Sequence, residues 1–154
     1  MRLTESELRT WGRRLGETVA APVVIALEGP LGAGKSVLAR AIGEGAGVSE
    51  PMPSPTFTLL QRYLARGEHE VVHLDLYRLS SPDELWELGW MQIPAENEIV
   101  LVEWPERAGE HLPSNHWRIR LGLLPGQPHL RQVDIARVGD PAPIAPVVSL
   151  TTGR

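Results

Sequence analysis

Gly29-Pro-Leu-Gly-Ala-Gly-Lys-Ser36 follows directly on the apolar run Val23-Val-Ile-Ala-Leu-Glu28. The first stretch fits the phosphate-loop pattern of a glycine, four residues, a glycine, a lysine and a serine or threonine. Its glycines let the backbone turn tightly and bring N–H groups against phosphate oxygens. A helix beginning here presents its free first-turn N–H groups to the same anion. Lys35 can add a charge at the β- and γ-phosphates, and the Ser36 hydroxyl can bind Mg²⁺.

Lys35 is the only lysine among the 154 residues, and the other 14 of the 15 basic residues are arginine. A planar guanidinium fits poorly in a cradle shaped for a compact ammonium. The alternative is a glycine-rich loop that binds nothing, but strand, loop and helix follow one another in the order that phosphate binding requires. With no second lysine, the chain cannot carry the Asn-Lys-x-Asp motif that reads guanine, which argues against a GTPase.

Length and composition favour one globular domain. The net charge of −4 does not favour nucleic acid as a direct electrostatic partner of the whole protein. The sequence contains no apolar run long enough to cross a membrane and no secretory leader, and it has no cysteine. We therefore expect a cytoplasmic protein that does not associate with membranes.

The hydrophobic pattern predicts a single α/β domain of the P-loop NTPase type over residues 1–138, followed by a proline-rich and poorly ordered tail at 139–154. We expect a mixed, mostly parallel sheet with antiparallel hairpins and with helices on both faces. The expected helices are 4–20, capped by Thr4 and Glu7, 34–45, and a short one from a second capping box, Ser81-Pro-Asp-Glu84, to about 88. The expected strands are 23–28 and 99–103, with hairpins 58–64/70–76 and 117–124/130–138.

Two of these strands end in a carboxylate, Asp75 and Glu103. In phosphate-loop proteins an acid at such a strand end lies near Mg²⁺ or the attacking water. Glu103 ends the more continuously apolar strand, which is expected beside the first strand of the sheet, so we assign it to the metal and Asp75 to the water. The alternative is that one of them is only a strand-end carboxylate. Trp104 follows Glu103 directly and is expected at the rim of the site.

The segment Pro51-Met-Pro-Ser-Pro-Thr-Phe-Thr58 is too rich in proline for a helix or a central strand. Its hydroxyls, with Thr56 among them, could approach the γ-phosphate or the metal as switch loops do. A plain connector is an equally good interpretation of these residues.

Four blocks of the chain resemble the TsaE (YjeE) family in order and spacing. They are the phosphate loop, Ser54-Pro-Thr-Phe-Thr-Leu59, His73-Leu-Asp-Leu-Tyr-Arg-Leu79 and Val102-Glu-Trp-Pro-Glu106. The resemblance implies a small bacterial ATPase in the threonylcarbamoyladenosine (t6A) modification of tRNA at position 37. It also implies the partners TsaB and TsaD, with tRNA reached through their complex. The chain departs from the family pattern at Pro30, where an acid is common, and at Ser36, which replaces threonine.

Carried over to this chain, the family pattern makes the phosphate loop the ATP site, with Ser36 and Glu103 on Mg²⁺. The Ser54–Thr58 segment matches the switch loop of the family. Asp75 and Trp104 match the acid and the tryptophan that are important for its function. The catalytic residues that we assign are Asp75, Lys35 and Thr56. The nucleotide-binding residues that we assign are Gly29, Leu31, Gly32, Ala33, Gly34, Lys35, Ser36, Val37, Trp104 and Arg131.

The activity expected is Mg²⁺-dependent ATP hydrolysis, slow in the isolated chain because no arginine is obviously placed to act as a finger. Two other function classes stay open. A small-molecule kinase would share the phosphate loop, and the arginines near residues 62–66 and 118–120 keep that alternative. A non-enzymatic module would use bound ATP only to control docking of a partner.

Overall fold

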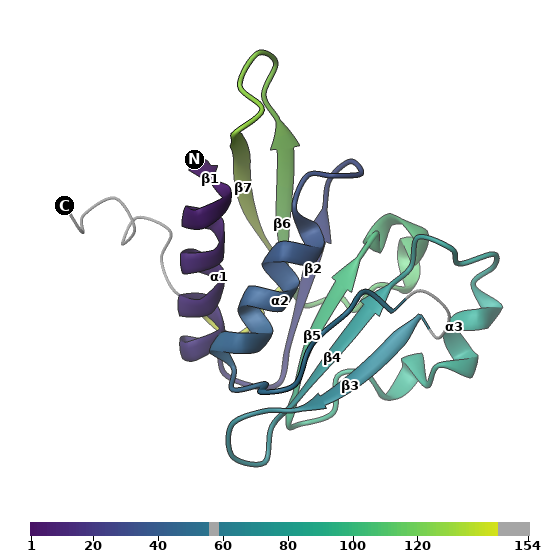
Figure 1. Cartoon of the computed structure of the whole chain (residues 1–154). Coiled ribbons are helices and arrows are strands. Elements are labelled where there is room, and N and C mark those ends of the chain that lie inside the picture. The colour runs from purple at the N-terminus through teal and green to yellow at the C-terminus, as the bar shows by residue number, and fades with distance from the viewer. Residues whose placement is uncertain (56–58, 145–154) are drawn as a thin grey trace.

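The computed structural model describes residues 1–55 and 59–144, which form one seven-stranded sheet in the order β1-β7-β6-β2-β5-β4-β3 (Figure 1). The strands are β1 (Arg2–Thr4), β2 (Val23–Glu28), β3 (Leu60–Leu64), β4 (Glu70–Asp75), β5 (Glu98–Glu103), β6 (His116–Leu123) and β7 (Leu130–Val138). The α-helices are α1 (Glu5–Thr18), α2 (Lys35–Gly45) and α3 (Asp83–Glu87). Three 3₁₀ turns accompany them, η1 (Trp90–Gln92), η2 (Pro105–Arg107) and η3 (Gly109–His111).

The centre of the sheet is parallel and its flanks are antiparallel. β2 pairs in parallel with β5 and β6, and β5 pairs in parallel with β4. β3 and β7 run the opposite way as the partners of β4 and β6, and β1 pairs antiparallel with β7. The structure confirms the predicted α/β class, the mixed sheet and both hairpins. It also confirms that the strand ending at Glu103 lies beside the first strand of the phosphate-loop unit.

Both faces of the sheet are covered, as predicted. Alternate residues of β2 point to opposite faces. Ile25 and Leu27 join the core beneath α1 and α2, whereas Val24 joins the core beneath α3 and η1. Figure 1 shows α1 and α2 side by side on one face and α3 at the far edge of the other.

Helices α1 and α2 approach each other so closely that glycine is required between them. A Cβ added at Gly16 of α1 would lie 2.0 Å from the backbone oxygen of Ile42. A Cβ at Gly45 of α2 would lie 1.9 Å from the backbone oxygen of Arg13. Because α2 begins at the phosphate loop, this contact also fixes the direction in which the loop is held.

The ends of the elements show where the sequence analysis was incomplete or wrong. The first helix has the predicted capping box between Thr4 and Glu7, but the residues before it form a short strand, β1, that was not predicted. The second predicted capping box is absent. Helix α3 has Pro82 at its N-cap with no side-chain hydrogen bond, and Ser81 contributes only its backbone carbonyl, to Glu84 N–H at 3.2 Å.

Residues 139–144 of the predicted tail contact the domain, and residues 145–154 lie outside the described part of the chain. Trp117 donates its indole N–H to the carbonyl of Ala142 at 2.6 Å, and Asp140 N–H donates to the side chain of Asn115 at 2.9 Å. Among the described residues, no helix combines the length and the apolar character needed to cross a membrane.

We predict that Gly16→Ala lowers the free energy of unfolding by about 2 kcal/mol or more, because the new methyl group must push the two helices apart. Chemical denaturation followed by circular dichroism measures this. The control is Gly122→Ala in β6, where the nearest atom to an added Cβ is 3.6 Å away, an ordinary contact distance. Equal stability of the Gly16→Ala variant and the wild type would contradict the close helix contact.

Candidate functional site

A cavity of about 300 Å³ opens where the carboxyl ends of β2, β4 and β5 meet the start of α2. Ligand sites in open α/β sheets commonly lie at this edge. The residues that line the cavity come from the phosphate loop, from α2 and from the two strand ends. They are Leu31, Gly32, Gly34, Lys35, Ser36, Val37, Asp75, Tyr77, Glu103 and Trp104.

The phosphate loop takes a backbone path that only glycine follows easily at its two ends. Gly29 has φ 148°, and a Cβ there would lie 2.4 Å from the backbone oxygen of Leu121 on β6. Gly34, the residue before α2, is left-handed with φ 106°. The loop therefore packs against β6 at its start and turns directly into the helix at its end, so that the free N–H groups of the first helical turn face the cavity.

Lys35 is buried, and its ammonium group lies between the loop and Trp104. Its Nζ donates hydrogen bonds to the carbonyls of Gly29 and Pro30, the latter at 3.0 Å, and lies 4.0 Å from the centroid of the Trp104 ring. Burial lowers the pKa of Lys35, and the nearby carboxylates of Glu103, Glu106 and Asp75 partly oppose that shift. The lysine is thus a positive charge held at the cavity wall by oxygens and an aromatic face.

Trp104 holds a left-handed backbone conformation, with φ 57° and ψ 51°, that is uncommon outside glycine. Such a conformation costs on the order of 1–3 kcal/mol and persists only where its surroundings impose it. Here the sharp turn after β5 places the indole over Lys35 and against Tyr77, with 4.9 Å between the two ring centroids.

Glu103 and Ser36 are joined by a direct hydrogen bond. Ser36 Oγ lies 2.9 Å from Glu103 Oε1 and 3.2 Å from Ser54 Oγ. Glu103 is only 2 % exposed, and its second oxygen, Oε2, lies 2.6 Å from His73 Nε2. The helix, the strand end and the proline-rich segment therefore meet at one hydroxyl group.

Asp75 lies beside Glu103 on the neighbouring strand and is half-buried. Its Oδ1 accepts the backbone N–H of Tyr77 at 3.0 Å. Burial raises the pKa of Asp75, and the charge of Glu103 raises it further, whereas the Tyr77 N–H opposes the shift. A carboxylate made more basic in this way is a better proton acceptor than an ordinary exposed aspartate.

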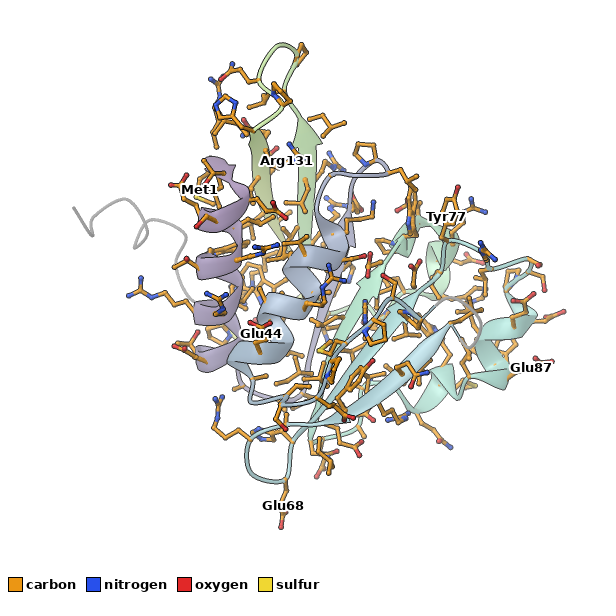
Figure 2. The ribbon with its side chains drawn as sticks, in the orientation of Figure 1. Met1, Glu44, Glu68, Tyr77, Glu87 and Arg131 are labelled. Carbon is orange, nitrogen blue, oxygen red and sulfur yellow. The ribbon has the colours of Figure 1, made fainter. Side chains whose placement is uncertain are left out.

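The structure places most of the predicted site residues around this one cavity. Gly29, Ala33 and Arg131 do not line it. Gly29 accepts a hydrogen bond from Lys35 behind the cavity wall, and Ala33 is packed in the core. Arg131 reaches the loop from β7, donating to the carbonyls of Ala33 at 3.1 Å and Gly32 at 3.3 Å. In Figure 2 Arg131 lies on the β7 side of the loop and Tyr77 on the α3 side. Thr56 lies outside the described residues.

Three residues at the site had no individual role in the sequence analysis: His73, Tyr77 and Ser54. His73 stands two positions before Asp75 on β4, so strand alternation alone puts both side chains on the face that α2 covers. The two-residue spacing between His73 and Asp75 therefore indicates from the sequence that His73 lies near the site. The contacts of Tyr77 and Ser54 depend on the paths of irregular segments, which the sequence does not specify.

The oxygen ligands present fit Mg²⁺. A serine hydroxyl beside a carboxylate matches the hard oxygen ligands that this ion prefers. Within residues 1–55 and 59–144, no group of three or more His, Asp or Glu side chains could hold a metal alone. One or two protein ligands are the usual number where substrate phosphates and waters complete the coordination of Mg²⁺.

The family model for "Threonylcarbamoyl adenosine biosynthesis protein TsaE" matches residues 3–127 of this chain. A protein from Nostoc sp. is 42% identical over 127 residues, covering 80% of this chain and 76% of the relative. One from Mycobacterium tuberculosis is 43% identical over 119 residues, covering 73% and 71%. Both are named tRNA threonylcarbamoyladenosine biosynthesis protein TsaE. The crystal structure of YdiB from Bacillus subtilus is similar with a TM-score of 0.69 at 26% identity, covering 90% of this chain and 84% of that one.

We predict that Asp75→Asn stabilises the protein at about pH 8 and that the gain disappears toward about pH 4. Folding raises the pKa of Asp75, so above that pKa the ionised carboxylate lowers the free energy of unfolding. As the pH falls through the folded-state pKa the carboxyl group is protonated, and this destabilisation disappears. Thermal melting over this pH range measures the effect, which should be a few degrees. The control is the exposed Asp134→Asn, and a gain for Asp75→Asn that is the same at every pH would contradict the mechanism.

Proposed function

This chain belongs to the TsaE family, whose members are named as proteins of tRNA threonylcarbamoyladenosine biosynthesis, and on that premise we propose that it is a Mg²⁺-dependent ATPase of this modification. The proposed partners are TsaB and TsaD homologues, with tRNA reached through their complex.

The observation that carries the proposal is the contact between Ser36 Oγ and Glu103 Oε1 at 2.9 Å. It joins the hydroxyl of the phosphate loop to the acid at the end of the adjacent parallel strand. These are the positions from which phosphate-loop ATPases hold their metal. Ser36 and Glu103 would hold Mg²⁺, which when bound neutralises charge shared between the β- and γ-phosphate oxygens.

The other residues of the cavity would bind the phosphates and direct the water. The loop N–H groups and Lys35 bind the β- and γ-phosphates and stabilise their charge. Asp75 Oδ1 is already occupied by Tyr77 N–H, and its Oδ2 has no hydrogen-bond partner among the described residues. In the proposed reaction Oδ2 accepts a proton from the water as the water oxygen bonds to the γ-phosphorus. The bond from that phosphorus to the β-phosphate oxygen breaks, and ADP and phosphate leave.

The isolated chain should hydrolyse ATP slowly. Of the described residues that line the cavity, Lys35 is the sole cation, because Arg131 is engaged with loop carbonyls outside it. A second positive charge at the γ-phosphate accelerates phosphoryl transfer strongly in related chemistry. We propose that the partner complex supplies that charge or orders the proline-rich segment.

We predict that Glu103→Gln raises the Mg²⁺ concentration needed for half-maximal hydrolysis about tenfold or more, with little change in affinity for metal-free ATP. Asp75→Asn serves as the matched variant. It should lower kcat by about 10²-fold or more and leave the Mg²⁺ requirement unchanged, since the acid is assigned to the water. Steady-state kinetics over a Mg²⁺ series measures both. If the Glu103→Gln variant keeps the wild-type Mg²⁺ response and the Asp75→Asn variant does not, the two assignments are reversed.

We predict that only chains able to hydrolyse ATP sustain repeated tRNA threonylcarbamoylation. The assay combines limiting TsaB and TsaD homologues with tRNA and threonylcarbamoyl-adenylate, and adds the wild-type chain, Lys35→Ala or no chain. Multiple rounds with wild type alone are expected, because Lys35→Ala removes the charge that binds the phosphates.

Two results would point elsewhere. Full activity with Asp75→Asn that binds but does not hydrolyse ATP would favour a nucleotide-gated docking module. ATP hydrolysis without any effect on tRNA modification would reject the proposed role and favour a small-molecule kinase, which a screen for phosphorylated metabolites would detect.

A further inference from the structure

We propose that His73 is a positioning residue for the metal side of the site: its imidazole holds the Glu103 carboxylate in the orientation that faces Ser36. The inference rests on the proposed function, in which Glu103 and Ser36 hold Mg²⁺. It assigns to His73 no contact with ATP or metal.

The contacts form a chain of three side chains from three elements. His73 Nε2 lies 2.6 Å from Glu103 Oε2, and Glu103 Oε1 lies 2.9 Å from Ser36 Oγ. His73 is 0 % exposed and Glu103 is 2 % exposed. One carboxylate oxygen is therefore held by the histidine, and the other is left for the hydroxyl at the cavity.

The sheet brings this pair together by register. β4 and β5 run parallel, with His73 opposite Leu101 and Asp75 opposite Glu103. Side chains two residues apart on a strand share a face, so His73 lies on the α2 face, diagonally below Glu103. From that position the imidazole reaches the carboxylate from beneath, on the side away from the cavity.

Within the described part of the chain, the side chain of His73 hydrogen-bonds to Glu103 alone. We assign the His73 proton to Nε2, because a carboxylate that serves as a metal ligand accepts the hydrogen bond. The other ring nitrogen, Nδ1, is buried and has no hydrogen-bond partner in the described part of the chain. A histidine retained only for packing has two buried ring nitrogens, each of which needs a hydrogen-bond partner. In His73 only Nε2 has a partner among the described residues, and that partner is Glu103, the assigned metal ligand.

Loss of the histidine donor should lower the affinity for the metal more than the affinity for the nucleotide. Without Nε2–H, Oε2 of a nearly inaccessible carboxylate has no partner, and such a group turns toward another donor. That rotation takes Oε1 away from Ser36. Loss of a partner that orients a metal ligand typically lowers metal affinity about 10- to 100-fold.

The test measures Mn²⁺ binding to the full chain, by electron paramagnetic resonance, in the presence of a non-hydrolysable ATP analogue. His73→Leu removes the donor and keeps an apolar side chain of similar bulk. His73→Gln restores an N–H donor near the position of Nε2. The matched control is His116→Leu, because His116 is 6 % exposed and its Nδ1 bonds only the carbonyl of Pro113, away from the site. Thermal melting of every variant accompanies the binding measurement.

We expect His73→Leu to weaken Mn²⁺ binding about 10- to 100-fold and His73→Gln to stay within about threefold of wild type. The control, His116→Leu, should lose thermal stability without losing Mn²⁺ affinity. If His73→Leu does not fold, His73→Asn replaces it, since its shorter amide falls short of Oε2, and the same weakening is expected.

Equal Mn²⁺ affinity in the wild type and the His73→Leu variant would overturn the inference. Equal weakening by the leucine and glutamine variants would also overturn it, because packing alone would then explain the loss. Failure of the wild type to bind Mn²⁺ with the nucleotide is a different result: it rejects the proposed function, and the inference with it.

Discussion

The parallel pairing of β2, β5 and β4 is the constraint on which the site depends. Its register sets Leu27 opposite Glu103 and Glu103 opposite Asp75, so that the two acids end side by side next to the strand that enters the phosphate loop. A slip of one residue would turn either acid to the other face of the sheet. The residues that precede each acid are buried on both faces, so the register is held by close packing on each side of the sheet and not by an alternation of apolar and polar residues.

The site gathers charged groups that are wholly or partly removed from water. Burial disfavours the charged form of Lys35 and of Asp75, and neither has an ion-pair partner at contact distance within the described residues. Glu103 instead shares its two oxygens between His73 and Ser36. Such an arrangement costs stability, and sites that bind charged substrates commonly carry this cost. In the proposed function, phosphates and a divalent ion complete the missing contacts.

Much of the fold and the outline of the site could be predicted from the sequence, because they rest on local patterns. The phosphate loop, the apolar strands that end in Asp75 and Glu103, and the two hairpins are each encoded within a few residues. Other features could not be predicted, because they depend on distant partners. β1 pairs with the edge of β7, and no side chain caps the start of α3 although the backbone at Pro82 is already helical. The path of the proline-rich segment brings Ser54 to Ser36, which no local pattern specifies.

The position of Trp104 has a practical consequence. Its indole is in contact with the charged end of Lys35 at 4.0 Å and lines the cavity, whereas Trp11 is sealed in the core. The emission of an indole depends on the charge and polarity next to its ring, so an occupant of the cavity that moved Lys35 would change the emission of Trp104, one of the five tryptophans of the chain. Intrinsic fluorescence of Trp104 would therefore report on what occupies the cavity.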